Sequence, residues 1–260
     1  MRTAHWLLVA VCAAGWCTQA AVAQPDQTPT VRVAVYDFTE PDDYEGHLVG
    51  RRAAEGTQVA LAAAGLWDLV ERPVLLHECA AENLTAPFGV GYLQMLGRKL
   101  NASLAVTGLV QTCAVNPDRG TAQVTLKCEL IEAIGGEGLG WFSGVGSAKR
   151  GDGEAATVEE IVDRALIEAA GNVAASLMSM NQWATSVMAR MDNGQLMMQP
   201  VAEPRIAAGE KAIVCRLAPD GWRLIAVIEV QRADDTSVRA RVVSQLSDPQ
   251  TNDVAVAVAR

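Results

Sequence analysis

A fixed order of strand-like and helix-like segments between residues 31 and 178 most constrains what this chain can fold into. Residues 31–38 are apolar on both faces apart from two side chains, as expected of a strand inside a mixed or parallel sheet. Residues 47–64 place small and apolar side chains at helical spacing, and residues 66–70 form a second strand. This order predicts an α/β domain with a mixed sheet and flanking helices.

The segments that follow extend the same pattern. Pro73 suits the first turn of a helix that runs to about Ala81. Residues 92–100 predict a further helix, which Asn101 can end in the left-handed conformation. The run Thr157-Val158-Glu159-Glu160 is a capping box that opens a long helix. Between these helices, alternating side chains predict strands at residues 103–113, 121–132 and 139–148.

The predicted hairpin of residues 103–113 and 121–132 bears on the cysteines. In a tight register Cys113 lies near Gln123 and Cys128 near Gly108, so the two thiols point to opposite faces. Four cysteines allow three complete disulfide connectivities, and sequence alone does not choose among them. We interpret Cys128 as a small buried residue rather than a bridge partner. The four cysteines beyond the leader are Cys79, Cys113, Cys128 and Cys215.

The pattern changes near residue 181, where helical periodicity stops and short strands begin. Turn signals at Asp192-Asn193-Gly194, Asp220-Gly221 and Asp234-Asp235 separate these strands. Five or six short strands in this stretch predict a small, SH3-like β-barrel over residues 182–260. The α/β domain is accordingly assigned to residues 31–180.

Residues 1–23 have the pattern of a cleavable secretory signal peptide. A polar start, a short apolar run and the small-residue site Ala21-Val22-Ala23 predict export and cleavage after Ala23. A short membrane anchor and a lipoprotein are the alternatives, although Val11 and Trp16, not small residues, precede the leader cysteines. Residues 24–30 are interpreted as a disordered lead-in. No later stretch has the length and apolarity of a transmembrane helix.

Charge and motifs argue against several classes of function. The formal net charge of −9 disfavours nucleic-acid binding, because phosphate repels an acidic surface. No Gly-x-Ser-x-Gly, Walker or Cys-x-x-Cys sequence occurs, and outside the leader only His47 and His77 could serve as histidine bases. We therefore predict a protein that is not an enzyme, with no catalytic, cofactor-binding or metal residue assigned.

Three local patterns contain the residue types of ligand sites. The adjacent residues His77-Glu78-Cys79 point in different directions on a helix, which disfavours a shared metal. The acidic residues 40–45 lack the ordered spacing of a calcium loop. Residues 135–140 are rich in glycine, but the strand that follows them offers no helix N-terminus for phosphate. We therefore interpret residues 77–79 as part of a helix surface, residues 40–45 as a solvated loop and residues 135–140 as a hairpin turn.

The methionines and tryptophans are candidates for packing within and between the α/β domain and the barrel. Six methionines near the boundary are interpreted as packing between the long helix and the barrel, with an interaction surface as the alternative. They are Met178, Met180, Met188, Met191, Met197 and Met198. The tryptophans are interpreted as core or inter-domain anchors. They are Trp67, Trp141, Trp183 and Trp222.

Four segments, in this order, resemble the CsgG-type curli production and transport family, which has a TolB N-terminal-domain-like fold. They are residues 33–38, 66–72, 105–110 and 124–131. Residues 206–211 before an apolar strand more weakly resemble the small β domain of the flagellar assembly protein FlgT. Unlike curli secretion pores, the chain has a poor lipidation site and no spare amphipathic hairpins for a membrane barrel.

The resemblance implies a non-catalytic, periplasmic component of the cell envelope, in curli assembly, secretion or a related adaptor role. Outer-membrane association, peripheral contact with a membrane and homo-oligomerisation remain open, and the expected partners are envelope proteins rather than nucleic acid. A periplasmic small-ligand binding module and a regulator of peptidoglycan synthesis are the alternatives.

Overall fold

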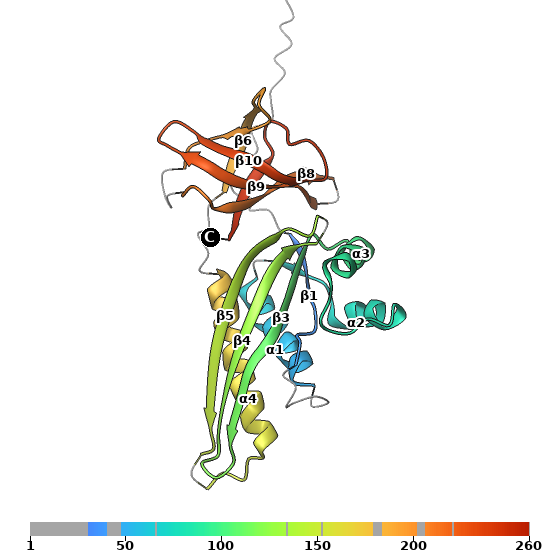
Figure 1. The fold of residues 1–260 in the computed structure, drawn as a ribbon, viewed down its shortest axis with the longest axis vertical. Helices are drawn as coiled ribbons and strands as arrows, with labels where there is room; N and C mark the ends of the chain where they lie inside the picture. Colours follow the sequence, from blue (N-terminus) through green and yellow to red (C-terminus); the bar gives the residue numbers. More distant parts are fainter. Residues whose placement is uncertain are drawn as a thin grey trace, which may run out of the picture.

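The computed structural model describes residues 31–40, 48–65, 67–133, 135–151, 153–178, 184–201, 206–219 and 221–259. These residues form an α/β part and, beyond residue 184, a β-barrel (Figure 1). The predicted leader, the lead-in and the boundary near residue 181 lie outside the described residues. No helix in the described ranges is both long and apolar enough to cross a membrane.

The α/β part is built on one five-stranded mixed sheet, as the sequence predicts. The strand order is β2-β1-β3-β4-β5. The short strand β1 pairs in parallel with β2 on one side and β3 on the other, while β3, β4 and β5 form an antiparallel meander. The strands are β1 (Arg32–Val35), β2 (Asp68–Leu69), β3 (Leu104–Asn116), β4 (Thr121–Glu132) and β5 (Gly138–Lys149).

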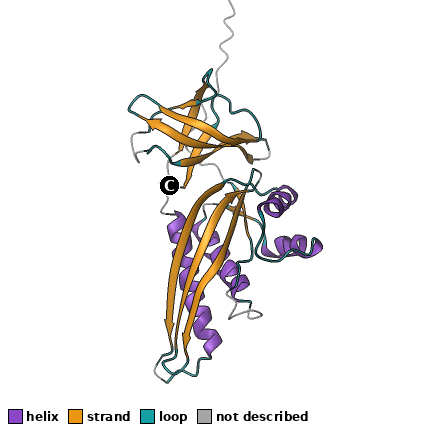
Figure 2. Ribbon diagram, viewed as in Figure 1, coloured by secondary structure: helices purple, strands orange, loops and turns teal. Residues whose placement is uncertain are grey.

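Helices cover the two faces of this sheet unequally (Figures 1 and 2). Helices α1 (Val49–Ala64) and α4 (Val158–Met178) share one apolar cluster with the long strands. Helices α2 (Arg72–Ala81) and α3 (Val90–Leu100) share another with the opposite face near β1. Because α2 and α3 are short and lie near β1, the far halves of β3, β4 and β5 have a helix on one face only.

Two predicted signals, Asn101 and the capping box at residues 157–160, act as expected, and Gly65 ends a helix in the same way as Asn101. Gly65 and Asn101 end their helices with φ of 68° and 52°, conformations that favour glycine and asparagine. Thr157 and Glu160 form the reciprocal capping box: the Glu160 amide donates to Thr157 Oγ1 at 3.2 Å, and the Thr157 amide to Glu160 Oε2 at 2.8 Å. Val158, the first residue of α4, is 38% exposed, whereas Ile161 and Val162 in the next turn are buried.

The β3–β4 hairpin corrects one prediction about the cysteines. Cys128 lies opposite Gly108 as expected, but an irregularity between Val110 and Thr112 places Cys113 opposite Val124, not Gln123. A bulge adds one residue and reverses the alternation beyond it. Both thiols therefore face the apolar cluster of α1 and α4. Cys128 is a fully buried free thiol, as interpreted from the sequence.

The second part is a closed six-stranded barrel, which confirms the predicted small all-β architecture. Its strand order is β10-β7-β6-β11-β8-β9, and every pairing is antiparallel. Buried valine, isoleucine and alanine side chains from these strands fill the interior. The strands are β6 (Ala184–Arg190), β7 (Leu196–Met198), β8 (Lys211–Ala218), β9 (Gly221–Ala233), β10 (Val238–Gln245) and β11 (Val254–Ala259).

The barrel contacts the end of the sheet where β4 turns into β5. Lys211 Nζ forms an ion pair with Glu137 and donates to the Gly138 carbonyl oxygen at 2.7 Å. Barrel side chains, among them Ile213 and Leu224, continue the apolar cluster of α1, α4 and the sheet. The division of the chain into domains at residues 31–180 and 182–260 stays a prediction.

Candidate functional site

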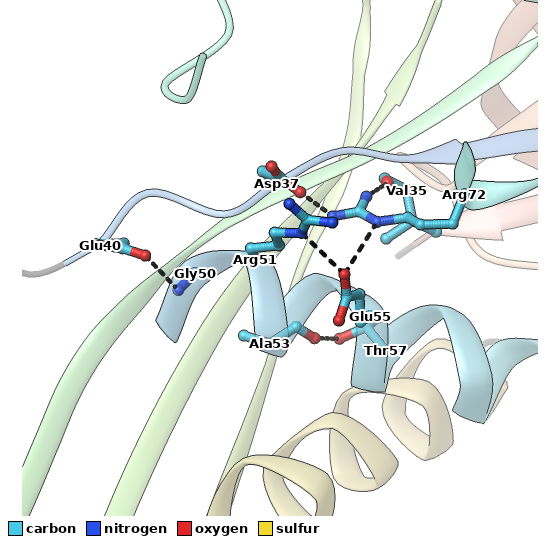
Figure 3. A network of polar contacts seen from close by, with 9 residues as sticks. All are labelled: Val35, Asp37, Glu40, Gly50, Arg51, Ala53, Glu55, Thr57 and Arg72. Atoms are coloured by element: carbon cyan, nitrogen blue, oxygen red, sulfur yellow. Dashed lines mark hydrogen bonds and ion pairs between the residues drawn. The ribbon is translucent and has the colours of Figure 1, made fainter. Parts of the chain in front are cut away.

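A polar network lies where β1 ends and the chain turns toward α1 (Figure 3). Arg72, the first residue of α2, donates from Nη1 to the Val35 carbonyl oxygen at 2.7 Å and forms an ion pair with Asp37. Glu55 of α1 lies 4.0 Å from Arg72 Nε and accepts a hydrogen bond from Arg51 Nε at 3.0 Å. Two arginines and two carboxylates from three elements therefore meet at the carboxyl end of a parallel strand.

Close backbone approach holds α1 against the segment that follows β1. The Gly50 carbonyl oxygen accepts from the Phe38 amide at 3.3 Å, and a Cβ added at Gly50 would lie 2.9 Å from the Phe38 carbonyl carbon. Glu40 Oε1 accepts from the Gly50 amide at 3.2 Å, which supplies an acidic partner to a helix start that has no side-chain cap of its own.

A groove of about 730 Å³ runs from this network along α2. Its polar end is formed by Asp37, Arg51 and Arg72. The remaining lining comes from α2 and the loop after it, and it is mostly apolar, with Leu75, Leu76, Leu84 and Phe88. The volume and the mixture of apolar wall and few polar groups fall within the range of small-molecule sites.

Cys79 also lines this groove, but its chemistry is that of a buried thiol. Burial is the largest influence and raises the pKa of Cys79, with Arg72 acting in the opposite direction. A reactive cysteine instead needs a lowered pKa and access to its thiolate. The thiol is therefore suited to packing, not to nucleophilic chemistry.

A second candidate surface is the side of β3, β4 and β5 that faces away from α4; we call it the open face. In β4, Val124, Leu126 and Cys128 point into the core shared with α4, so Thr125, Lys127 and Glu129 point outward. On β5 the outward side chains include Trp141 and Val145, which are 56% and 46% exposed. Lys127 Nζ lies 4.6 Å from the centre of the Trp141 ring.

The free edge of β5, beside the open face, is covered by side chains of α4. Asn172 Nδ2 donates to the Val145 carbonyl oxygen at 2.7 Å, and the Ser147 amide donates to Glu168 Oε2 at 2.7 Å. Both backbone groups would otherwise be available to another strand. At Val145 and Ser147, the edge of the sheet beside the open face is therefore not free to pair with another strand.

The patterns weighed as ligand sites take ordinary structural positions. His77, Glu78 and Cys79 lie on α2, and the described chain contains no cluster of three such side chains that could hold a metal ion. Glu40 is the one member of the acidic 40–45 segment within the described residues, and it binds the Gly50 amide. Of the glycine-rich residues 135–140, residues 135–137 lie in the connection from β4 to β5, as predicted, and residues 138–140 already belong to β5.

The tryptophans and methionines divide between packing and exposure. Trp67 and Trp222 pack against the apolar cluster, as interpreted, but the exposure of Trp141 contradicts its assignment as an anchor. Met198 belongs to the barrel's own core rather than to a helix–barrel contact, and Met188 is 42% exposed. Trp183, Met180 and the side chain of Met178 lie outside what the structure describes.

Comparison with known proteins yields remote structural similarity only. No protein family and no curated protein matches the sequence. The PelC dodecamer from Paraburkholderia phytofirmans is 16% identical, covers 55% of this chain and 86% of its own, and gives a TM-score of 0.32. Lipoprotein GNA1162 from Neisseria meningitidis is 11% identical, with 47% and 84% covered and a TM-score of 0.36. The LpoB C-terminal domain from Escherichia coli is 19% identical, with 47% and 86% covered and a TM-score of 0.35. Similarity at this level does not transfer a function.

Proposed function

We propose that this protein is a non-catalytic component of the bacterial cell envelope, an assembly or secretion adaptor that binds a partner protein through its open face. The observation that carries the proposal is Trp141, a large aromatic side chain of β5 that is more than half exposed on the open face. Tryptophan is among the residue types that contribute most to protein–protein affinity.

The surroundings of Trp141 indicate what kind of partner fits. Lys127 and Lys149 lie on the open face together with Glu129, whereas the other acidic residue of β4, Glu132, is buried; the whole chain carries a net charge of −9. This face therefore favours an acidic contact surface on a folded partner. Strand addition at β5 is disfavoured, because Asn172 and Glu168 already occupy its Val145 and Ser147 backbone groups.

The cellular setting of the proposal rests on the predicted signal peptide and on the resemblance of the sequence to the CsgG-type family. Both support a periplasmic location. Association with the outer membrane is a more specific form of the same proposal. Curli assembly, a FlgT-like role and regulation of peptidoglycan synthesis are specific forms of the proposal, and the identity of the partner distinguishes them.

The test uses the full exported chain and one substitution on each side of the sheet. Trp141→Ala should abolish photo-crosslinking to an envelope protein that wild-type protein captures. With that protein purified, Trp141→Ala should weaken binding by about thirtyfold, the effect of losing a residue that dominates an interface. The control is Ile167→Ala on α4, which removes a side chain that is 66% exposed on the other side of the molecule.

Equal binding by wild type, Trp141→Ala and Ile167→Ala would overturn the assignment of the open face. Cross-links formed only between copies of this chain would overturn the adaptor role in favour of self-assembly.

A further inference from the structure

The groove beside α2 has the form of a binding site in which apolar and charged groups are separated. Its polar end holds Asp37, Arg51 and Arg72, whereas its walls are mostly apolar. The apolar residues include Leu75, Leu76, Leu84 and Phe88, and the polar residues of the walls are His77, Asn83 and Thr85. The groove follows α2, whose ten residues span about 15 Å. A ligand that fills it must therefore pair a polar head with an apolar body.

Hydrogen-bond donors exceed acceptors at the polar end. Arg72 uses Nη1 on the Val35 carbonyl oxygen and Nη2 on Asp37, but its buried Nε has no hydrogen-bond partner. The Glu55 carboxylate approaches this Nε only to 4.0 Å. Since a buried donor without an acceptor is costly, the guanidinium of Arg72 is incompletely satisfied in the free protein.

The neighbouring groups add to this surplus of donors. The Arg51 side chain binds Glu55 yet stays 44% exposed beside the groove. Helix α2 begins here with Glu71 as its N-cap residue, but the Glu71 side chain makes no capping hydrogen bond and no acidic residue lies in the first turn, so no side chain of α2 accepts from its first amides. Asp37 is the one carboxylate in the groove lining, and Arg72 already binds it.

We infer that this groove binds a small carboxylic acid with an aliphatic or aromatic tail, the carboxylate lying at Arg51 and the start of α2 and the tail along the leucines and Phe88. Arginine suits this head because its planar N–H groups match a carboxylate in pairs. The tail removes the exposed surface of Leu76 and Leu84 from water. This site is independent of the open face and adds a ligand to the proposed adaptor.

The probe is octanoate, titrated into the full exported chain and followed by amide shifts in two-dimensional NMR. Saturable shifts should be confined to residues 35–38, 49–55 and 72–88, the segments that line or contact the groove. Octylammonium and 1-octanol carry the same tail with a positive or neutral head, and each should bind at least about tenfold more weakly than octanoate. Tighter binding of octylammonium would show that Asp37 and Glu55 dominate and would overturn the inference.

Two substitutions locate the head and the tail. Arg51→Gln should weaken octanoate binding about tenfold while leaving the thermal midpoint nearly unchanged, because Arg51 and Glu55 are an exposed pair. Leu76→Ala should weaken octanoate and octanol alike. The control Arg98→Gln removes an exposed arginine of α3 that does not line the groove. Shifts scattered over the surface, or identical affinity in Arg51→Gln and Arg98→Gln, would overturn the site.

Discussion

The five-stranded sheet and the barrel solve the problem of exposed strand edges in different ways. The barrel has no edge, because its strand order returns to its start and each strand has two neighbours. The open sheet ends at β2 on one side and at β5 on the other. The edge at β2 offers little pairing surface, because β2 has only two residues. At the edge formed by β5, side chains of α4 occupy backbone groups that another strand could otherwise pair with.

The contrast shows why glycine gathers in β5 and not in the barrel strands. Gly144 and Gly146 face α4 so closely that an added Cβ would enter its backbone. Only this close approach brings Glu168 and Asn172 within reach of the strand edge. The open sheet thus relies on a helix held at short range, whereas the barrel relies on its own pairing.

The largest effect should come from a substitution that pushes α4 away. At Gly144 a Cβ would lie 2.7 Å from the Val173 nitrogen and still closer to the Ala169 carbonyl oxygen. Backbone cannot give way as a flexible side chain does, so Gly144→Ala should lower the free energy of unfolding by about 3 kcal/mol or more, measured by urea denaturation. The control is Gly171→Ala, a position in α4 with open space around it, which should raise stability by about 0.5–1 kcal/mol. Equal effects of the two would contradict the close packing.

A smaller loss should follow from opening the barrel at its buried ion pair. Asp253, 3% exposed, accepts from Arg216 Nε at 2.7 Å and Nη2 at 2.8 Å and from the Gln250 amide at 2.7 Å. This carboxylate joins β8 to the turn before β11, so Asp253→Asn should cost about 2 kcal/mol in thermal or urea unfolding.

Asp248→Asn is the matched control for the barrel, because its pair with Arg190 is exposed and should contribute less than about 0.5 kcal/mol. If the two substitutions cost the same, the barrel does not depend on the buried pair.

Removing the side chains that cover the edge of β5 should change how the protein associates more than it changes its stability. The double substitution Glu168→Ala with Asn172→Ala should cost about 1 kcal/mol but leave the Val145 and Ser147 backbone groups open to another strand. Sedimentation velocity should show new concentration-dependent oligomers. The control, Glu159→Ala, changes an exposed carboxylate of the same helix. An unchanged sedimentation pattern would mean that these side chains do not protect the edge.

The smallest effect concerns the loop that leads from β5 into α4. Hydrogen bonds from Arg164 and the Gly151 amide lower the pKa of Glu154 from its usual 4.5 to about 2. Because the folded state holds the carboxylate form, its contribution is present above about pH 4.5 and is lost as the pH falls toward 2. A carbon-detected NMR titration should find the low midpoint, and Arg164→Gln should raise it. A wild-type midpoint near 4.5 would exclude the interaction.

The sequence predicted the secondary-structure elements well, but it predicted less well which side of the sheet a given side chain faces and whether that side is covered. The positions of the helix ends, the capping box and the strands of both parts follow from local signals that a single segment contains. The face of Cys113 does not, because the irregularity at Val110–Thr112 depends on how two strands twist against each other. Trp141 shows the same limit: alternation places it on one side of β5, but nothing in the segment says whether a helix covers that side.

The polar network illustrates the same limit at a candidate site. Asp37, Glu55 and Arg72 stand far apart in the chain, and no motif connects them. They meet because β1 and β2 run in parallel, which brings the end of β1 and the start of α2 to one edge of the sheet.

The sequence by itself determined which segments are helices and strands, and that an α/β pattern is followed by an all-β part, because periodicity and capping are local properties of the chain. Only the tertiary structure decided that α4 protects the edge of β5, that Trp141 is left uncovered and that a groove opens beside α2. Each of these depends on distances between elements, and such distances are set by packing across the whole molecule.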